Sequence, residues 1–403
     1  MKEGYKQTEL GIIPENWDIK RLGDIGPVKM CRRIFADETC SLGDIPFYKI
    51  GTFGSKPDAY ISREKFEDYK KKYPFPKVGD ILISAAGTIG RTVVFDGSDS
   101  YFQDSNIVWI DNDEKLVINQ FLNLILFKSN FTTEGGTLKR LYNNILLSTK
   151  FASPPIEEQN AIANCLSTWD EAIEKQQKLI EAKEIRHKAL MQKLLSGKKR
   201  LPGFTDEWKE VKLGDLFEFK KGSGLSKDLL TESGQSCILY GELFTKYREV
   251  ISEVQSFTES TTNVVSQAGD ILLPGSTTTT GIDLAKASVV LKSNVYLGGD
   301  INILRPKATL NSTFVSYLLN YEYKYQISAM AQGITIIHLY GKDLKHIKIS
   351  IPAVKEQEDI VDILEDSISE ILIEKQKVDQ LKEQKKALMQ KLLTGKVRLP
   401  LNN

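Results

Sequence analysis

The strongest constraint on this chain is that its sequence repeats. Residues 189–202 recur at 387–400 with twelve of fourteen positions identical, at an offset of 198 (387 minus 189). Near the start of each half, Trp17 and Leu22-Gly23-Asp24 return at an offset of 191. The upstream residues that return at an offset of 198 are Pro154, Glu158 and Gln159, as Pro352, Glu356 and Gln357. The chain is therefore predicted to contain two copies of one unit of about 195 residues.

Each copy ends in a stretch with the composition of a long helix. From Ile156 to Ser196 there is no Pro or Gly, and Lys, Glu, Gln, Leu and Ala dominate. Pro155 and Gly197 mark the two ends. Steps of four and three residues meet seven apolar side chains in ten positions in each copy, which predicts two antiparallel coiled-coil helices, each roughly 60 Å long at 1.5 Å per residue. The predicted seam residues are Ile162, Leu166, Trp169, Ile173, Ile180, Leu190, Leu194, Ile360, Leu364, Ile371, Val378, Leu381, Leu388 and Leu392.

The remaining sequence has the short apolar runs and turn residues of a mixed fold. Strands are predicted at 80–84 and 92–95, with counterparts at 270–273 and 287–290, and helices at 119–128 and 313–325. The first strand pair surrounds a short turn, whereas the second surrounds the polar loop 275–281. The predicted fold is α+β, with two globular regions joined by the two long helices in a pseudo-two-fold internal repeat. The predicted boundaries are 1–153 and 201–351 for the globular regions, and 154–200 and 352–403 for the helices.

The repeat is also circular. The segment that follows the second helix, Arg398-Leu399-Pro400, matches the linker after the first, and Gly11 to Trp17 resembles the continuation of that linker. The two ends of the chain are therefore expected to lie close together. The helical pieces match better than the globular pieces, so one scaffold is expected to carry two unlike recognition surfaces.

Composition excludes several classes of protein. Hydrophobic residues are 41% of the chain and charged residues 27%, and no apolar run reaches the roughly 18–20 residues that span a bilayer. No apolar segment follows Met1 to Lys6, so a signal peptide is not predicted and a cytoplasmic location is expected. The four cysteines form no Cys-x-x-Cys pair, and there are only three histidines. Neither a disulfide framework nor a metal site is predicted. His187, which lies on the helix seam, is interpreted as a tolerated core residue.

The net charge of +1 does not by itself indicate a nucleic-acid partner. Basic residues are nevertheless clustered: residues 186–200 contain six and residues 385–398 contain five, without any acid. Two interpretations remain open. Cations near the end of a helix are favoured by its dipole, and they also bind phosphate.

The order of these motifs, which occurs twice, resembles the specificity subunit of type I restriction-modification systems. The first copy carries Thr8 to Pro14, Leu22-Gly23-Asp24, Val78 to Leu82, Gly87 to Gly90, and Pro154 to Gln159 at the start of a long helix. The resemblance implies a non-catalytic subunit of bacterial host defence, whose two target recognition domains bind the halves of a bipartite, asymmetric site in double-stranded DNA. The helices would form a spacer that docks two methyltransferase subunits, which restriction subunits with translocase and nuclease activity join. It also implies that S-adenosylmethionine, ATP and Mg²⁺ belong to those partners, and this chain would hold no cofactor. The Thr-rich loop before Gly281 departs from the simpler turn of the first copy.

Candidate DNA contacts are the basic, amide, hydroxyl and aromatic side chains of predicted loops, because such groups bind phosphates and base edges. In the first globular region they are Arg32, Arg33, Lys70, Lys71, Lys72, Tyr73, Thr88, Arg91, Asn143 and Asn144. In the second they are Lys220, Lys221, Ser276, Thr277, Thr278, Thr279, Thr280 and Gln332. The acidic helix starts, 157–159 and 356–357, are either partner-docking surfaces or helix caps.

Two other functions fit less well. A DNA adenine methyltransferase needs an aromatic residue after its Pro-Pro pair, and here Ile156 follows Pro155. Gly222-Ser223-Gly224 is a lone Gly-x-Gly, and the Glu-x-Lys of Glu210 to Lys212 lacks an acid in the first copy, so neither a cofactor loop nor a nuclease is predicted. The second alternative, a coiled-coil adaptor that binds proteins, is compatible with the composition.

Overall fold

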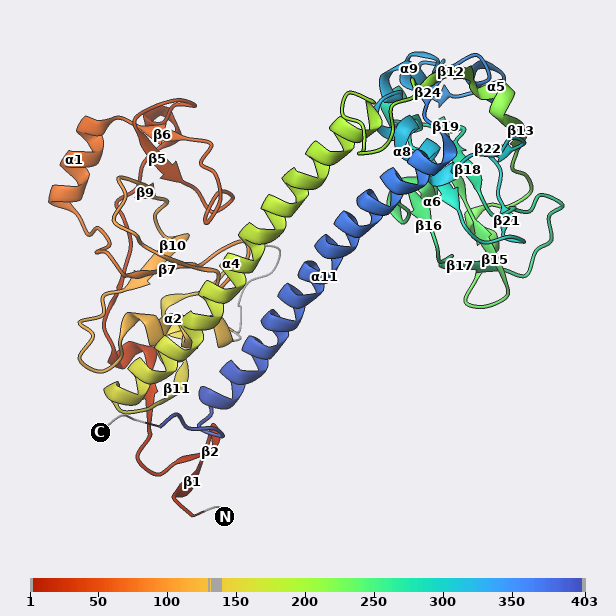
Figure 1. Cartoon of the computed structure of the whole chain (residues 1–403). Helices are drawn as coiled ribbons and strands as arrows, with labels where there is room; N and C mark the ends of the chain where they lie inside the picture. Colours follow the sequence, from red (N-terminus) through yellow and green to blue (C-terminus); the bar gives the residue numbers. More distant parts are fainter. Residues whose placement is uncertain (1–2, 130, 132–139, 401–403) are drawn as a thin grey trace. The chain divides into compact units, whose positions relative to one another are not determined.

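A computed structural model describes residues 3–129, 131 and 140–400 of the chain. The chain divides into two compact units, one formed by residues 1–176 with 377–403 and the other by residues 177–376. Each unit contains one globular region and parts of both long helices, as the colours of Figure 1 show.

Within the described residues, the first unit contains four small sheets, which are antiparallel or mixed. Its central sheet has the order β4-β10-β7-β8, and a three-stranded sheet has the order β6-β5-β9, with β5 and β9 parallel. These strands are β4 (Val28–Lys29), β5 (Ile45–Tyr48), β6 (Tyr60–Ile61), β7 (Ile81–Ser84), β8 (Thr92–Val94), β9 (Tyr101–Phe102) and β10 (Ile107–Ile110). The others are the hairpin β1 (Tyr5–Thr8) and β2 (Gly11–Pro14), and the pair β3 (Asp18–Arg21) and β11 (Lys150–Ser153). The helices are α1 (Arg63–Lys72), α2 (Asn119–Lys128) and α3 (Asn143–Ser148).

The second unit repeats this topology with additions. Its central sheet has the order β13-β22-β18-β20-β16, and its second sheet has the order β14-β17-β15-β21, in which β15 and β21 are parallel. These strands are β13 (Phe217–Lys221), β14 (Leu230–Thr231), β15 (Gln235–Ile238), β16 (Val250–Ile251), β17 (Ser256–Thr258), β18 (Asp270–Pro274), β20 (Ser288–Val290), β21 (Tyr296–Leu297) and β22 (Ile301–Pro306). The pairs are β12 (Lys209–Lys212) with β24 (Lys348–Ile351), and β19 (Ser276–Thr277) with β23 (Ile337–His338). The short helices are α5 (Leu213–Leu216), α6 (Tyr240–Thr245), α7 (Gly281–Leu284), α8 (Ser312–Tyr321), α9 (Lys324–Ala329) and α10 (Gly341–Leu344).

Two local predictions need correction. The helix expected over 313–325 is interrupted: α8 ends at Tyr321 and α9 begins at Lys324. Tyr323 lies at the break, where its hydroxyl accepts a hydrogen bond from the Ser350 amide at 2.8 Å and so ties this position to β24. The polar loop expected over 275–281 is partly a strand, because Ser276 and Thr277 are buried and pair with β23.

The two long helices are α4 (Ile156–Leu195) and α11 (Val354–Leu392). They begin just after Pro155 and Ala353 and end before Gly197 and Gly395, which adopt positive φ angles of +68° and +65°. A left-handed residue is the usual way to end an α-helix, and glycine adopts it without a Cβ clash. The predicted helices and their boundaries are thus present in the structure.

The helices are antiparallel, as cross-helix ion pairs in each unit indicate. In the second unit Lys183 lies 3.1 Å from Glu374, and Arg186 lies 2.8 Å from Glu370. In the first unit Lys385 lies 2.5 Å from Asp170. The apolar seam lies inside: of the predicted seam residues, only Trp169, Leu190, Leu381 and Leu388 are half-buried rather than buried. His187 is also buried on this seam, and its Nδ1 atom has no hydrogen-bond partner among the described residues.

A buried carboxylate lies near the start of each long helix, where a segment from the other copy binds it. In the first clamp, formed by Trp17, Glu158 and Arg398, the guanidinium donates to both oxygens of Glu158 at 2.9 and 2.7 Å. The Trp17 indole donates a third hydrogen bond at 2.9 Å. In the second clamp, formed by Arg200 and Glu356, the guanidinium donates at 2.7 and 2.5 Å.

These contacts correct one prediction and confirm another. Glu158 and Glu356 are almost completely buried, so they are not available for partner docking, whereas their place in the first turn of each helix agrees with the alternative of a helix cap. The neighbouring Gln159 and Gln357 are buried too, and each donates to the carbonyl of the proline five residues earlier. Tyr5 donates to the Gly395 carbonyl at 2.9 Å, so segments near the two ends of the chain lie together, as the circular repeat predicts (Figure 1).

Within the described residues, no helix is both long and apolar enough to cross a membrane.

Candidate nucleic-acid interface

The end of β18 places two polar side chains of the second unit next to each other. The amide of Gly275 donates to the Asp300 carbonyl at 2.6 Å, and its carbonyl accepts from the Leu339 amide at 2.9 Å. The next residue, Ser276, pairs with His338 in the β19–β23 ladder. Asp300 and His338, which are far apart in sequence, therefore flank the same strand end.

The end of β7 in the first unit has the same backbone contacts. The amide of Ala85 donates to the Asn106 carbonyl at 2.7 Å, and its carbonyl accepts from the Leu141 amide at 2.9 Å. The next residue, Ala86, forms an antiparallel bridge with Arg140. Asn106 and Arg140 thus occupy the positions of Asp300 and His338, and we call this arrangement of backbone hydrogen bonds the shared frame.

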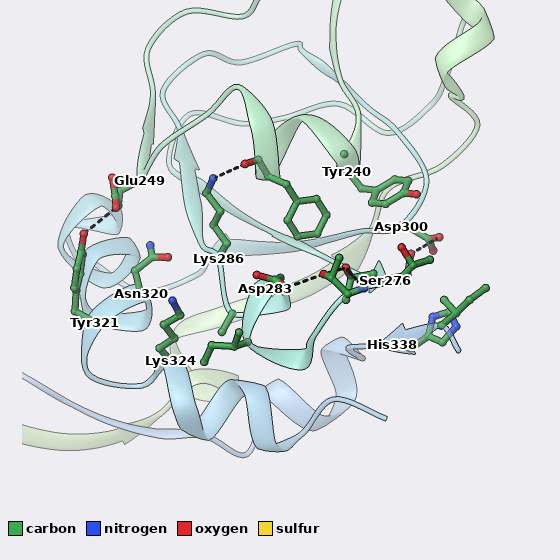
Figure 2. A pocket seen from close by; sticks show the side chains of 18 residues that line it. Tyr240, Glu249, Ser276, Asp283, Lys286, Asp300, Asn320, Tyr321, Lys324 and His338 are labelled. Carbon is green, nitrogen blue, oxygen red and sulfur yellow. Dashed lines mark hydrogen bonds between the residues drawn. The ribbon is translucent and has the colours of Figure 1, made fainter. Parts of the chain in front are cut away.

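In the second unit the shared frame borders a cleft of about 900 Å³. The cleft is lined by polar and aromatic side chains from several elements: Tyr240, Phe244, Glu249, Ser276, Thr277, Thr278, Thr279, Ile282, Asp283, Lys286, Asp300, Asn320, Tyr321, Lys324, Ile336 and His338. Figure 2 shows Ser276, Asp300 and His338 gathered on one side of the cleft, with Glu249 and Tyr321 on the opposite side.

The Asp300 carboxylate is held in place by its neighbours. One oxygen accepts from the Ser276 hydroxyl at 3.1 Å, and the other lies 3.2 Å from the Lys221 ammonium. Its backbone has a φ of +55°, a conformation that costs a non-glycine residue free energy and that often occurs at functional sites. His338 stacks on Tyr340, with ring centroids 6.0 Å apart and planes at 18°. This wall therefore offers an acceptor, an imidazole and hydroxyl groups to a ligand.

Burial shifts the pKa values of two groups on the opposite wall. Lys286 donates to the Phe244 carbonyl at 3.2 Å, and burial lowers the pKa of its ammonium. The Tyr321 hydroxyl donates to Glu249 at 3.1 Å, and burial raises the pKa of that phenol. At the start of α7, hydrogen bonds from the Thr279 and Thr280 hydroxyls lower the pKa of Asp283. The two threonines thus cap a helix, and Thr279 also lines the cleft.

In the first unit, the shared frame presents a different set of groups. Arg140 Nη2 donates to Asn106 Oδ1 at 2.8 Å and to Ser105 Oγ at 3.3 Å. Ser105 has a φ of +49°, so this turn also contains a left-handed residue other than glycine. The side chains at the shared frame are therefore a hydrogen-bond donor in the first unit and an acceptor with an imidazole in the second.

The candidate DNA contacts of the first unit lie at several separate places. The Arg32 guanidinium lies 5.4 Å from the centre of the Tyr73 ring, so these two are together. Arg33 binds Asp104 at 2.7 Å. Lys70, Lys71 and Lys72 lie at the end of α1, where Lys72 binds Asp68 and the Lys70 ammonium lies 5.0 Å from the centre of the Phe66 ring. Thr88 and Arg91 belong to the turn after β7, where Arg91 donates to the Phe53 carbonyl at 2.8 Å. Asn143 and Asn144 are exposed at the start of α3.

The candidates of the second unit are more concentrated. Lys221 lies beside Asp300, and Ser276 to Thr279 line the cleft. The backbone of Gln332 exchanges two hydrogen bonds with that of His338, at 2.9 and 2.7 Å, so this residue lies next to the shared frame. Lys220 instead pairs with Glu218 at 3.2 Å. Thr280 caps α7 and does not line the cleft.

The candidate DNA contacts predicted from the sequence do not include the side chains of the shared frame, which are Asn106, Arg140, Asp300 and His338. A signal for two of them exists in the repeat: Leu141-Tyr142 returns as Leu339-Tyr340 at an offset of 198, which aligns Arg140 with His338. Lys286 and Lys324 were also missed, and no sequence pattern distinguishes them from other surface lysines.

The motifs that suggested an enzyme have structural roles. The Pro154-Pro155 pair precedes the first turn of α4. Gly222 ends β13, where its amide donates to the Ile301 carbonyl at 2.9 Å. Glu210 lies on β12 and pairs across the ladder with Lys348 at 2.6 Å. Among the described residues, no group of three or more His, Cys, Asp or Glu side chains could hold a metal ion.

Comparison with known proteins matches both halves of the chain. The sequence model of the type I restriction modification DNA specificity domain matches residues 14–184 and again residues 205–383. A putative type I restriction enzyme specificity subunit of Haemophilus influenzae is 57% identical over 169 residues, which are 42% of this chain and 44% of that protein. The putative MjaX specificity subunit of Methanocaldococcus jannaschii is 26% identical, over 99% of this chain and 97% of that protein. The chain thus aligns with less than half of the first relative and nearly all of the second.

Solved structures share the fold. A chain from a study of complex assembly and conformational transition of the type I R-M system has a TM-score of 0.61 at 18% identity, covering 96% of this chain and 99% of that one. The crystal structure of the type I S subunit from M. genitalium has a TM-score of 0.55 at 18% identity, covering 97% and 99%. At this identity the likeness concerns the fold, and it confirms two α+β globular regions joined by long helices.

Proposed function

Because the chain belongs to the family of type I restriction-modification DNA specificity subunits, we propose that its two globular regions are target recognition domains that bind unlike halves of one bipartite DNA site. A specificity subunit is the non-catalytic recognition component of such a system. The proposed site is asymmetric, because the two regions that contact its two halves differ from each other.

One observation carries this proposal: the two regions have the same frame but different functional groups on it. The first presents Arg140 with Asn106, and the second presents His338 with Asp300. Donors and acceptors on base edges differ between base pairs, so a guanidinium where the other region has an imidazole, and an amide where it has a carboxylate, select different bases. Two copies with identical groups would instead favour a palindromic site.

The helix pair is proposed to fix the spacing between half-sites and to bind two methyltransferase subunits, which restriction subunits with translocase and nuclease activity join. The exposed apolar side chains of the helices support a docking role, since Leu179, Ile185, Leu372 and Ile373 are between 43% and 72% exposed. S-adenosylmethionine, ATP and Mg²⁺ would then be bound by those partners, and the assembly would work in the cytoplasm. The proposed functional segments are 1–153, 154–200, 201–351 and 352–403.

The test is genome-wide mapping of N6-methyladenine in cells that express this chain with its neighbouring methyltransferase subunit, against a control without this chain. The expected result is a split, asymmetric methylated motif that requires the chain. Absence of a motif despite a stable complex would favour a protein-binding adaptor. Methylation by the purified chain alone would favour a DNA adenine methyltransferase.

Two variants test the division of roles. Replacing residues 203–351 with the corresponding region of a relative should change one half of the motif and leave the other half unchanged. Deleting one heptad from α4 together with the facing heptad of α11 should change the number of base pairs between the halves. A motif unaltered by either change would contradict the proposal.

A further inference from the structure

The shared frame has side chains with opposite hydrogen-bonding character in the two units. Starting from the proposed function, we infer that Arg140 recognises a guanine in one half-site and that Asp300, supported by His338, recognises a cytosine in the other. Both residues belong to the shared frame, where Arg140 takes the position of His338 and Asp300 takes the position of Asn106.

The backbone hydrogen bonds of the shared frame are the same in both units. Each strand end is held by one amide and one carbonyl hydrogen bond of 2.6 to 2.9 Å to the same two neighbouring segments. Each turn also retains a left-handed residue other than glycine, Ser105 or Asp300. Such backbone strain persists where the surrounding structure enforces it, and it is common at binding sites.

Neighbouring side chains orient the functional groups of Arg140 and Asp300. Asn106 and Ser105 accept from a single nitrogen of Arg140, Nη2, among the described residues. This contact orients the guanidinium, and the N–H groups of Nε and Nη1 are suited to donate to O6 or N7, the acceptors that guanine presents in the major groove. Asp300 is fixed similarly, by Ser276 on one oxygen and Lys221 on the other, while its side chain remains 42% exposed.

The chemistry of the Asp300 carboxylate indicates which base edge suits it. An ionised carboxylate only accepts hydrogen bonds, and on a base edge it suits the amino group of cytosine. The cleft beside Asp300 supplies hydroxyl groups from Ser276, Thr277 and Thr279, which accept or donate to neighbouring base or phosphate groups. The ammonium of Lys221, which is 65% exposed, lies beside the carboxylate and is suited to contact the phosphate backbone.

The experiment maps methylated motifs for the full complex of this chain with its methyltransferase subunit, comparing wild type with Arg140→Ala, Arg140→Lys and Asp300→Asn. Arg140→Ala should make one guanine position of the first half-site degenerate, with at least a roughly 10-fold loss of discrimination there. Arg140→Lys keeps the positive charge but lacks the planar guanidinium with its fixed N–H directions. It should therefore relax the same position. Asp300→Asn should relax one position of the second half-site only.

Matched controls are Lys115→Ala in the first unit and Lys348→Ala in the second, because both lysines are exposed and pair with local acids. Both controls should leave the motif unchanged. Thermal unfolding of each complex identifies a variant that fails to fold, and for Arg140 the lysine variant then carries the test.

Three results would overturn the inference. The first is an unchanged motif in folded Arg140→Lys and Asp300→Asn complexes. The second is a uniform loss of methylation with unchanged base preference, which identifies a phosphate contact. The third is relaxation of the half-site opposite to the one assigned by exchange of residues 203–351. All three leave the proposed function standing, whereas absence of any motif for the wild type would overturn that function itself.

Discussion

The two units bury the same carboxylate near the start of a long helix, yet they satisfy it differently. Glu158 accepts hydrogen bonds from both Arg398 and Trp17, whereas Glu356 accepts from Arg200. The equivalent indole nitrogen, in Trp208, is buried without a hydrogen-bond partner among the described residues. The arginine is retained because a buried carboxylate requires a counter-charge. The indole hydrogen bond is a smaller contribution and differs between the copies.

The largest predicted effect comes from removing each arginine. Arg200→Ala leaves the Glu356 carboxylate buried and unpaired, which should lower the free energy of unfolding by about 3–5 kcal/mol. Arg398→Ala should cost about 1 kcal/mol less, because Trp17 still donates to Glu158. Urea unfolding followed by tryptophan fluorescence measures both, since Trp17 belongs to the first clamp and Trp208 packs against Phe314 in the second unit.

The exposed Lys199→Ala serves as the control and should change the free energy of unfolding by less than about 0.5 kcal/mol. Equal losses for the two arginine variants would show that the Trp17 hydrogen bond contributes nothing.

The next effect compares the aspartates that begin the equivalent central strands. Asp270 is buried and paired with Arg305 through hydrogen bonds of 3.0 and 2.7 Å. Asp80 is buried too, and burial raises the pKa of its carboxyl. Asp270→Asn should therefore lower the free energy of unfolding by about 2–3 kcal/mol, because Arg305 loses its partner. Asp80→Asn should be neutral or stabilising at pH 7.

The raised pKa of Asp80 determines whether stability rises or falls with pH. A folded pKa above the unfolded value means that the native state binds the proton more tightly, so this group adds stability as pH falls through the folded pKa. The stability of wild type relative to Asp80→Asn should therefore rise as pH falls from 7 towards about 4, the ordinary aspartate pKa, and the difference between the unfolding midpoints of the two proteins measures it. A large loss of stability in Asp80→Asn at pH 7 would contradict the argument.

A smaller effect is expected at His187, which corresponds to the ion-paired Lys385 of the first unit. Burial lowers the pKa of His187, so the unfolded chain binds the proton more readily. Stability should fall as pH drops below about 6.5, the ordinary histidine pKa, by roughly 1 kcal/mol. In His187→Leu the loss between pH 7 and pH 5 should shrink, as measured by urea unfolding. An identical loss in both proteins would assign the pH dependence to other groups.

The smallest effect is predicted for the exposed cross-helix ion pairs. Glu370→Gln removes contacts with Lys183 and Arg186, and Asp170→Asn removes the contact with Lys385. Each should cost less than about 1 kcal/mol and should fall towards zero in 1 M salt. Thermal unfolding at low and high salt measures the difference. A loss comparable to that of Arg200→Ala would mean that these pairs are structural.

The sequence by itself determined the features that depend on local pattern. Proline and glycine boundaries, helix-forming composition and the four-three spacing specify α4 and α11, and the repeat and its circular order specify two related units. These features were predictable because helix formation and its termination depend on residues close in the chain.

Only the tertiary structure decided which polar groups meet. Arg398 and Glu158 are 240 residues apart, and Asp300 and His338 flank the same strand end only because β18 ends between the segments that carry them. The sequence left Glu158 open as a docking residue or a helix cap and predicted a polar loop around Ser276 and Thr277, while the structure buries all three side chains. The physical reason is that burial and hydrogen-bond partnership are set by segments distant in sequence, which no local pattern in one chain specifies.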